Sequence, residues 1–167
     1  MTRAGARAKP IAVAAVAAAA VAILGALMTD LGPWYASLRQ PAWKPPDWAF
    51  GPVWTVIFAL AAAAGVGGWR VAPNARWREQ LLSQFALNGF LNVFWSLLYF
   101  RLHRPDWALL EVPFLWGSVA WIAWTLRGRS ARAAALLLPY LVWVAIAAVL
   151  NWQTVQLNGP FGAARGI

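Results

Sequence analysis

The sequence predicts an all-α membrane protein in which five transmembrane helices form one bundle. Hydrophobic residues make up 62% of the 167-residue chain and charged residues only 11%, whereas a soluble domain carries about 25% charged residues. Five stretches are free or nearly free of charge, and each has the roughly 20 residues that a membrane-spanning helix needs. Lipid offers the backbone no hydrogen-bond partner, so these stretches are expected to be helical. The expected spans are 10–29, 48–69, 80–100, 107–126 and 133–156.

These spans are expected to form a single domain over residues 1–158, followed by a flexible Gly-rich tail at 159–167. The first span is rich in alanine and follows three basic residues, so a cleaved secretory signal is an alternative. Its apolar run is longer than the usual signal core of about 7–15 residues. As a mature helix it would pack closely, or offer a dimer or partner interface, through its small residues Ala14, Ala18, Ala22 and Gly25.

The loop between the first two spans is rich in proline and tryptophan. It runs from Trp34 to Trp48 and contains the segment Pro41-Ala42-Trp43-Lys44-Pro45-Pro46. Proline restricts the backbone, and a restricted loop loses less entropy when it closes. We therefore expect a stiff, amphipathic lid at one mouth of the bundle, with Trp54 of the second span close to it.

Polar side chains mark the inward faces of the third and fifth spans, because polar groups in lipid need a partner or a cavity. The third span carries one stripe at helical spacing, made of Gln84, Asn88, Asn92 and Trp95. The fifth span carries a similar stripe, made of Tyr140, Trp143, Ala147 and Asn151. Hydrogen bonding between helices is an open alternative for Gln84 and Asn88. Asn92 and Asn151 are predicted to line a pocket, because each shares its stripe with a tryptophan.

The fourth span contains Glu111, the only acid inside any expected span. An ion pair with Arg101 or Arg104 is one interpretation, and a polar anchor at one end of the cavity is another. His103 is the only histidine and sits in a short basic loop. A single histidine can ligate haem iron, but a solvated loop residue is the simpler interpretation.

The formal net charge is +9, which favours attraction to anionic lipid headgroups. The basic residues are scattered among loops with no aromatic groove between them, so nucleic-acid binding is not expected. Nine of them would lie on the side of the N-terminus and five on the other side. The positive-inside rule then places the N-terminus in the cytoplasm. The Ala- and Arg-rich composition suggests a GC-rich bacterial genome, and hence a bacterial cell membrane.

Several kinds of chemistry lack the residues that they need. The chain has no cysteine, which excludes disulfides, thiolate metal sites and a cysteine nucleophile. We find no Ser-His-Asp set, no phosphate-binding Gly loop and no metal-ligand cluster in the sequence. Hydrolysis and phosphoryl transfer are therefore not expected, and neither a metal nor a required cofactor is predicted.

Five motifs, one in the first loop and one in each of the four later spans, resemble the tryptophan-rich sensory protein family, also called the translocator protein or peripheral benzodiazepine receptor family. The resemblance covers about residues 31–158. The motifs are Trp34-Tyr35 with Pro41-Ala42-Trp43-Lys44-Pro45-Pro46, Gly51-Pro52-Val53-Trp54-Thr55, Leu91-Asn92 with Trp95-Ser96, Trp107-Ala108-Leu109 with Glu111, and Leu138-Pro139-Tyr140-Leu141-Val142-Trp143 with Leu150-Asn151.

The resemblance implies a homodimeric five-helix bundle with a pocket beneath the first loop. The family is associated with porphyrins, haem and related tetrapyrroles, and in some members with sterols and benzodiazepine-type ligands. Carried over by motif, the pocket residues would be Trp54, Trp95, Trp143, Asn92 and Asn151, and the lid residues Trp34, Trp43 and Pro45. Two departures are Asn88, where the family often has Gln, and the absence of a Tyr followed by Lys or Arg near the end of the fifth span, which lowers the expectation of sterol binding.

We therefore hypothesise a membrane receptor or transporter for flat apolar ligands such as porphyrin or haem. Arg39 or Lys44 on the lid would meet the ligand carboxylates. One alternative is a light- and oxygen-dependent porphyrin-degrading enzyme that uses Trp54 or Trp143 as electron donor. Another alternative is a non-catalytic scaffold that modulates partner membrane proteins.

Overall fold

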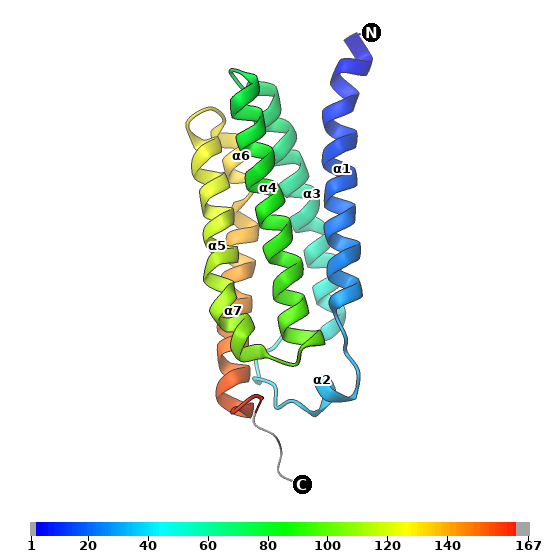
Figure 1. Ribbon diagram of the computed structural model, residues 1–167, viewed down its shortest axis with the longest axis vertical. Helices are drawn as coiled ribbons and strands as arrows, with labels where there is room; N and C mark the ends of the chain where they lie inside the picture. Colours follow the sequence, from blue (N-terminus) through cyan, green and yellow to red (C-terminus); the bar gives the residue numbers. More distant parts are fainter. Residues whose placement is uncertain (1–2, 163–167) are drawn as a thin grey trace.

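The computed structural model describes residues 3–162, and over that range its regular structure is entirely helical. Five long helices stand side by side, and α1 begins and α7 ends at opposite ends of the bundle (Figure 1). All five are long and apolar enough to cross a membrane. The predicted fold class is confirmed, and the chain is an integral membrane protein that crosses the bilayer several times. The expected tail begins where the last helix ends, and its residues 163–167 lie outside the described part of the chain.

The long helices overlap the five predicted spans. They are α1 (Arg3–Met28), α3 (Asp47–Val71), α4 (Ala75–Ser96), α5 (Pro105–Arg127) and α7 (Leu138–Asn158). Helix α4 begins where the side chain of Asn74 accepts a hydrogen bond from the Trp77 N–H at 2.9 Å, a regular N-cap. It continues into a π-helical turn over Leu97–Arg101, in which the Leu102 N–H donates to the Leu97 carbonyl at 3.0 Å.

The fifth span is not the continuous helix over 133–156 that the sequence predicted. It is divided into a short helix, α6 (Ala131–Ala135), and α7 (Leu138–Asn158), with a turn at Leu136 and Leu137 between them. Pro139 explains the break, because it has no N–H to donate to the carbonyl four residues earlier and its ring would clash with that carbonyl. Proline is well tolerated in the first turn of a helix, which is its place in α7.

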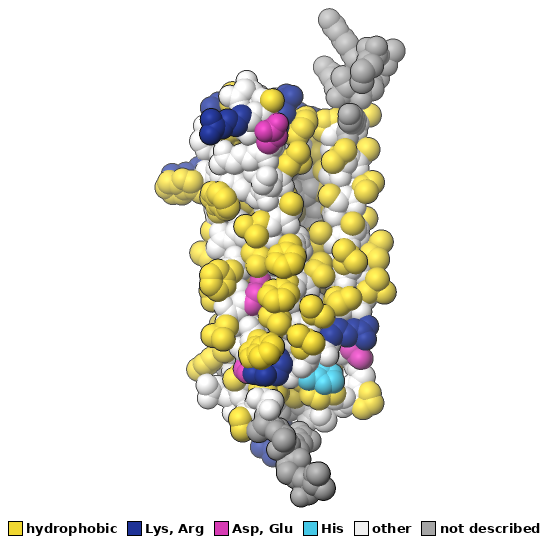
Figure 2. Space-filling view, in the orientation of Figure 1, with side chains coloured by type: hydrophobic (Ala, Val, Ile, Leu, Met, Phe, Trp, Pro, Cys, Tyr) yellow, Lys and Arg dark blue, Asp and Glu magenta, His cyan; other side chains and the backbone are white. Residues whose placement is uncertain are grey.

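Helix α5 provides much of the bundle core. One of its faces is buried against α4, α6 and α7 through Val112, Leu115, Val119, Ile122 and Leu126. Its other face exposes Phe114, Trp116, Trp121 and Trp124, as expected for a helix surface in contact with lipid. Apolar side chains are spread over the visible length of the bundle, and Lys and Arg gather mainly at its ends (Figure 2).

The loop after α1 crosses one end of the bundle and contains a short helix, α2 (Pro33–Ser37). It is fastened to α7 at two points. The backbone of Arg39 exchanges two hydrogen bonds with the Asn158 side chain, at 2.7 and 2.9 Å. The indole Nε1 of Trp43 donates to Gln153 Oε1 at 2.6 Å. These contacts hold the loop across the end of the bundle.

Candidate functional site

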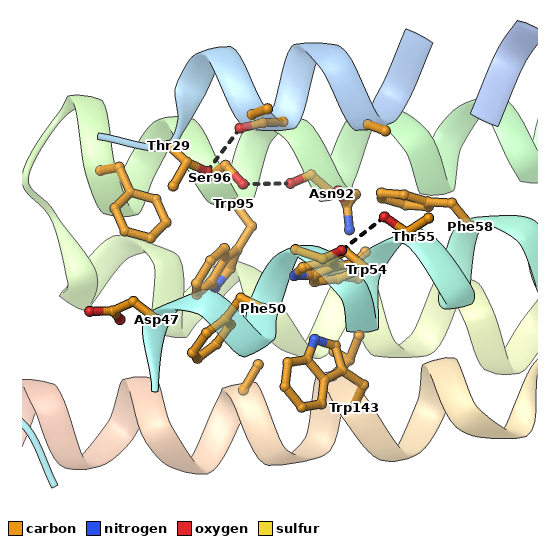
Figure 3. A pocket seen from close by; sticks show the side chains of 18 of the residues that line it. Thr29, Asp47, Phe50, Trp54, Thr55, Phe58, Asn92, Trp95, Ser96 and Trp143 are labelled. Atoms are coloured by element: carbon orange, nitrogen blue, oxygen red, sulfur yellow. Dashed lines mark hydrogen bonds between the residues drawn. The ribbon is translucent and has the colours of Figure 1, made fainter. Parts of the chain in front are cut away.

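A cavity of about 460 Å³ lies beneath this loop, inside the bundle. All five long helices contribute to its lining, and α2 and the π-helical turn after α4 add one residue each. Its size falls within the range of about 300–1,000 Å³ that is typical of small-molecule sites. The walls are mainly aromatic, formed by Phe50, Trp54, Phe58, Trp95, Phe100 and Trp143 (Figure 3).

The aromatic rings hold one another in place. Trp54 and Phe58 lie one helical turn apart on α3, and their rings stack with centroids 5.2 Å apart. Trp54 also meets Tyr140 of α7 edge-on at 5.8 Å, and Phe50 meets Trp143 edge-on at 5.5 Å. Offset and edge-to-face contacts of this kind are favourable. The α3 and α7 walls of the cavity are therefore packed against each other as one unit.

The α1 wall is different, because its side chains are small. Ala22, Gly25 and Ala26 line the cavity there. Ala14 and Ala18, further towards the N-terminus, line a second hollow between α1 and its neighbours. The small residues of α1 therefore lie beside α3 and α4 along an open hollow, and their role as a dimer or partner interface stays a prediction.

Few polar groups reach the cavity from its walls. Asn92 lines it and donates from Nδ2 to the Tyr140 hydroxyl at 3.1 Å. The buried indole Nε1 of Trp143 has no hydrogen-bond partner within the described chain. A buried donor without a partner is costly, and this nitrogen is enclosed by its neighbours, so a ligand acceptor would reach it only after a side-chain rearrangement.

A charged cluster stands at the mouth of the cavity. Tyr35 and Asp47 both line it, and the Tyr35 hydroxyl donates to Asp47 Oδ1 at 2.9 Å. Lys44 Nζ donates to the same carboxylate oxygen and to the Tyr35 hydroxyl, the latter at 3.1 Å. Burial, followed by the hydrogen bond to Asp47, raises the pKa of Tyr35. The ammonium group of Lys44 was expected to meet a ligand carboxylate, and in this structure it is held by Asp47.

The structure brings part of the predicted site together and separates the rest. The predicted residues that line the cavity are Trp54, Asn92, Trp95, Trp143 and Ala147. Tyr140 does not line it but stands behind Asn92 as its hydrogen-bond partner. The predicted residues outside the lining are Trp34, Trp43, Pro45 and Asn151, and neither lid tryptophan faces the cavity.

The two lid tryptophans are instead engaged elsewhere. Trp34 stacks on His103, with ring centroids 4.1 Å apart and planes at 15°. Trp43 is 46% exposed and donates to Gln153. Successive side chains of the short helix α2 diverge by about 100°, so Tyr35 rather than Trp34 reaches the cavity. His103 is exposed, with a left-handed backbone (φ 55°), and does not line the cavity.

Asn151 is buried between helices instead of facing the ligand space, contrary to the prediction. In the amide orientation that pairs each donor with an acceptor, its nitrogen donates to the Pro105 carbonyl and its oxygen accepts from the Leu109 N–H, at 3.0 Å each. Pro105 and Leu109 are partners in the regular i to i−4 ladder of a helix. Asn151 therefore bridges the first turn of α5 to α7.

The other amides of α4 bond helix to helix, as the alternative interpretation held. Gln84 Nε2 donates to Thr125 Oγ1, and Asn88 Nδ2 donates to Ser118 Oγ, each at 2.9 Å. Both acceptors lie on α5. The polar stripe of α4 therefore joins two helices over most of its length and reaches the cavity only at Asn92.

Glu111 forms neither of the predicted contacts. Its side chain is buried, and both carboxylate oxygens lack a hydrogen-bond partner within residues 3–162. Arg104 pairs with Asp106, while Arg101 lies 4.0 Å from Asp30 and donates to the Leu27 carbonyl. The expected ion pair is therefore wrong, and Glu111 is not part of the cavity lining.

Sequence reasoning missed several lining residues, among them Tyr35, Asp47, Phe50, Phe58 and Phe100. A signal for two of them was present, since Phe50, Trp54 and Phe58 repeat every four residues and so share one face of α3. Phe100 lies in the π-helical turn after α4. In a π-helical turn each hydrogen bond spans one residue more than in an α-helix. The residues after such a turn therefore face a direction that α-helical spacing does not predict.

The site is suited to binding a flat apolar molecule. It combines aromatic walls, a few polar groups and a polar mouth, which is the usual design of a small-molecule pocket. Within the described part of the chain, no group of three or more His, Cys, Asp or Glu side chains is placed to hold a metal ion. The cavity lining contains one carboxylate, Asp47, which is already paired with Lys44.

Comparison with known proteins agrees with the motifs. Residues 12–157 match the TspO/MBR family. The chain is 35% identical over 130 residues to a Tryptophan-rich protein TspO of Chlorobaculum tepidum, covering 75% of this chain and 79% of that protein. It is 34% identical over 134 residues to the Translocator protein of Ovis aries, covering 75% of each. It is 33% identical over 142 residues to the Tryptophan-rich sensory protein of Cereibacter sphaeroides, covering 85% of this chain and 87% of that protein.

The match to the family extends from within α1 to the end of α7, so it includes all five long helices and the loop above the cavity. Together with the five-helix bundle, it establishes that this chain belongs to the TspO/MBR family of integral membrane proteins.

Proposed function

We propose that this protein binds porphyrins or related tetrapyrroles in the cavity beneath the loop and acts as a receptor or transporter for them. The observation that carries the proposal is that Trp54, Trp95 and Trp143, from three different helices, line one cavity. Relatives of the chain bear the names Tryptophan-rich sensory protein and Translocator protein, which supports a sensing or transport role.

The physical basis of affinity is burial of the ligand disc between aromatic walls. Burial of apolar surface stabilises a complex by roughly 25 cal/mol per Å², and each favourable aromatic pair adds about 0.5–1.5 kcal/mol. The amide of Asn92 would supply a polar contact to the ring system. The ligand carboxylates would stay at the mouth, beside Lys44. Sterols and other flat apolar molecules are a secondary ligand class for the same walls.

The test is a titration of the purified protein with protoporphyrin, followed by tryptophan quenching and by the Soret band. The double variant Trp54→Phe, Trp143→Phe is expected to bind several-fold more weakly, since two indole surfaces are replaced by smaller rings. The matched control is Trp121→Phe, Trp152→Phe, which removes two exposed indoles outside the cavity lining. Equal affinity of both double variants would overturn the assignment of the site.

A second candidate activity, light-dependent porphyrin breakdown, is favoured by the position of two oxidisable indoles in the cavity lining. An excited porphyrin would take one electron from Trp54 or Trp143, giving a porphyrin radical anion and an indole radical cation. The porphyrin radical anion would pass its extra electron to molecular oxygen, forming superoxide. The indole radical cation would then oxidise the neutral porphyrin and be restored, and the porphyrin radical cation would combine with superoxide, so that the ring takes up O2. Illuminated protein in air should then consume porphyrin faster than the Trp54→Phe, Trp143→Phe variant at equal occupancy. Equal rates at equal occupancy would contradict this activity.

Orientation and assembly belong to the same proposal. The end of the bundle opposite the loop carries Arg70, Arg76, Arg78, Arg127, Arg129 and Arg132, so the positive-inside rule places that end in the cytoplasm. The loop would then face the outside of the cell membrane. A homodimer is expected from the family resemblance, and native mass spectrometry from mild detergent measures it directly.

A further inference from the structure

A second hollow, of about 850 Å³, lies between α1 and the α3–α4 pair. We call it the α1 groove. Small residues on three helices contribute to its lining, including Ala14 and Ala17 on α1, Gly65 on α3 and Gly89 on α4. The lining is apolar apart from Asn88, whose amide nitrogen is already bonded to Ser118. The α1 groove is separate from the ligand cavity, and Phe58 is the one residue that lines both.

The shape of the α1 groove fits a chain rather than a disc. Its lining on α1 runs from Pro10 to Leu24, which is about 21 Å along the helix at about 1.5 Å per residue. That exceeds half of the roughly 30 Å hydrocarbon thickness of a bilayer. An apolar hollow at this depth does not hold ordered water, which needs polar partners. An extended hydrocarbon chain entering from one leaflet has the length and polarity to fill it.

The end of the α1 groove near Trp69 lies beside a cationic side chain. Trp69 lines the groove, and the guanidinium carbon of Arg78 lies 4.9 Å from the centre of its ring. Arg78 Nε is buried and has no hydrogen-bond partner in the described part of the chain. Helix α4 begins at Ala75, three residues before Arg78, and a helix N-terminus favours an anion. Glu79 is the only acid near this end, against several arginines.

These features identify one occupant by its chemistry. We infer that the α1 groove binds one acyl chain of an anionic glycerophospholipid, with its phosphate held by Arg78 beside Trp69. The guanidinium group of arginine matches a phosphate oxygen pair, and anionic lipid is attracted to the basic end of a membrane protein. The occupied groove would fill the space between α1 and the rest of the bundle.

The experiment uses the full chain in nanodiscs of equal phosphatidylglycerol and phosphatidylcholine, with retained lipid counted by native mass spectrometry. We expect one retained phosphatidylglycerol per chain, and about a tenfold lower phosphatidylglycerol preference in Arg78→Gln, as for loss of a charge-assisted hydrogen bond. The matched charge control is Arg129→Gln, an exposed arginine on another loop, which should retain the lipid.

A second pair of variants tests the groove itself. Ala17→Phe places a ring inside the α1 groove and should abolish retention, whereas Ala15→Phe on the exposed side of α1 should not. The inference would be overturned if the wild type and Arg78→Gln both retained phosphatidylglycerol and phosphatidylcholine in equal amounts, because that result indicates a non-specific layer of lipid around the protein. It would also be overturned if the wild type were a lipid-free dimer that Ala17→Phe dissociates, since a second copy would then cover the groove. If Ala17→Phe does not fold, the comparison of Arg78→Gln with Arg129→Gln still decides.

Discussion

The ammonium group of Lys44 donates to the carboxylate of Asp47 at the mouth of the aromatic cavity, so the lid cation is paired within the protein itself. A ligand carboxylate must compete with Asp47 for this cation. We predict that Asp47→Asn tightens binding of protoporphyrin by up to about fivefold, the range expected for a partly exposed ion pair. Titrations with protoporphyrin and with its dimethyl ester measure the effect. The ester has no carboxylate, so an equal gain for both ligands would contradict the explanation.

The bond between Trp43 Nε1 and Gln153 Oε1 ties the loop to α7. We predict that Gln153→Leu speeds ligand release. The variant lacks the hydrogen bond from Trp43, so opening the loop requires about 0.5–1.5 kcal/mol less free energy. Stopped-flow dissociation of bound porphyrin measures the rate, which is expected to rise by about two- to tenfold. Gln156→Leu, on an exposed position of the same helix, is the control and should leave the rate unchanged.

Asn151 and Asn92 are both buried amides, but they have different roles in the structure. Asn92 lines the cavity and Asn151 bridges α7 to the start of α5. We predict that Asn151→Leu destabilises the bundle by about 1–3 kcal/mol, as for loss of partners in a buried polar contact, with little change in ligand affinity. Asn92→Leu should weaken ligand binding. Thermal unfolding in detergent and the porphyrin titration separate the two effects, and an affinity loss confined to Asn151→Leu would contradict the assignment.

Gly68 is required by close packing of helices. A Cβ atom there would contact Leu126 and would lie 2.8 Å from Leu81 Cδ2, which no ordinary contact tolerates. We predict that Gly68→Ala destabilises the protein by about 1–3 kcal/mol through overpacking. Gly117→Ala is the control, because nothing lies within 4 Å of its Cβ position, and it should be neutral or stabilising, since alanine favours helix more than glycine. The thermal unfolding midpoint should fall in Gly68→Ala and should stay the same or rise in Gly117→Ala.

Glu111 is a buried carboxyl group without a hydrogen-bond partner in the described part of the chain. Burial of such a group costs free energy, and apolar replacement of buried ionisable groups is often neutral or stabilising. We predict that Glu111→Met raises the thermal unfolding midpoint. A stabilised variant that no longer binds or turns over porphyrin would reveal a functional group maintained against stability. A destabilised variant would instead show that the carboxyl group has a structural partner.

Part of the site was readable from sequence spacing. Trp54, Asn92 and Trp143 were predicted to converge, and all three line the cavity. Each lies on a face that polar or aromatic neighbours mark at helical spacing. The prediction that Trp34 lines the pocket failed, because the short helix α2 determines which of its side chains points to the cavity. Trp34 and Tyr35 are adjacent in α2, and the rotation of about 100° from one helical residue to the next turns Tyr35 to the cavity and Trp34 to His103.

The sequence alone determined the number of membrane helices, their approximate limits and the faces that turn inward. It could do so because a lipid environment demands a long apolar helix at each crossing and penalises polar groups that face outward. Tertiary structure alone decided that Asn92 lines the cavity while Asn151 bridges two helices. Those outcomes depend on how neighbouring helices are rotated and displaced along their axes. Spacing within one helix carries no information about either quantity.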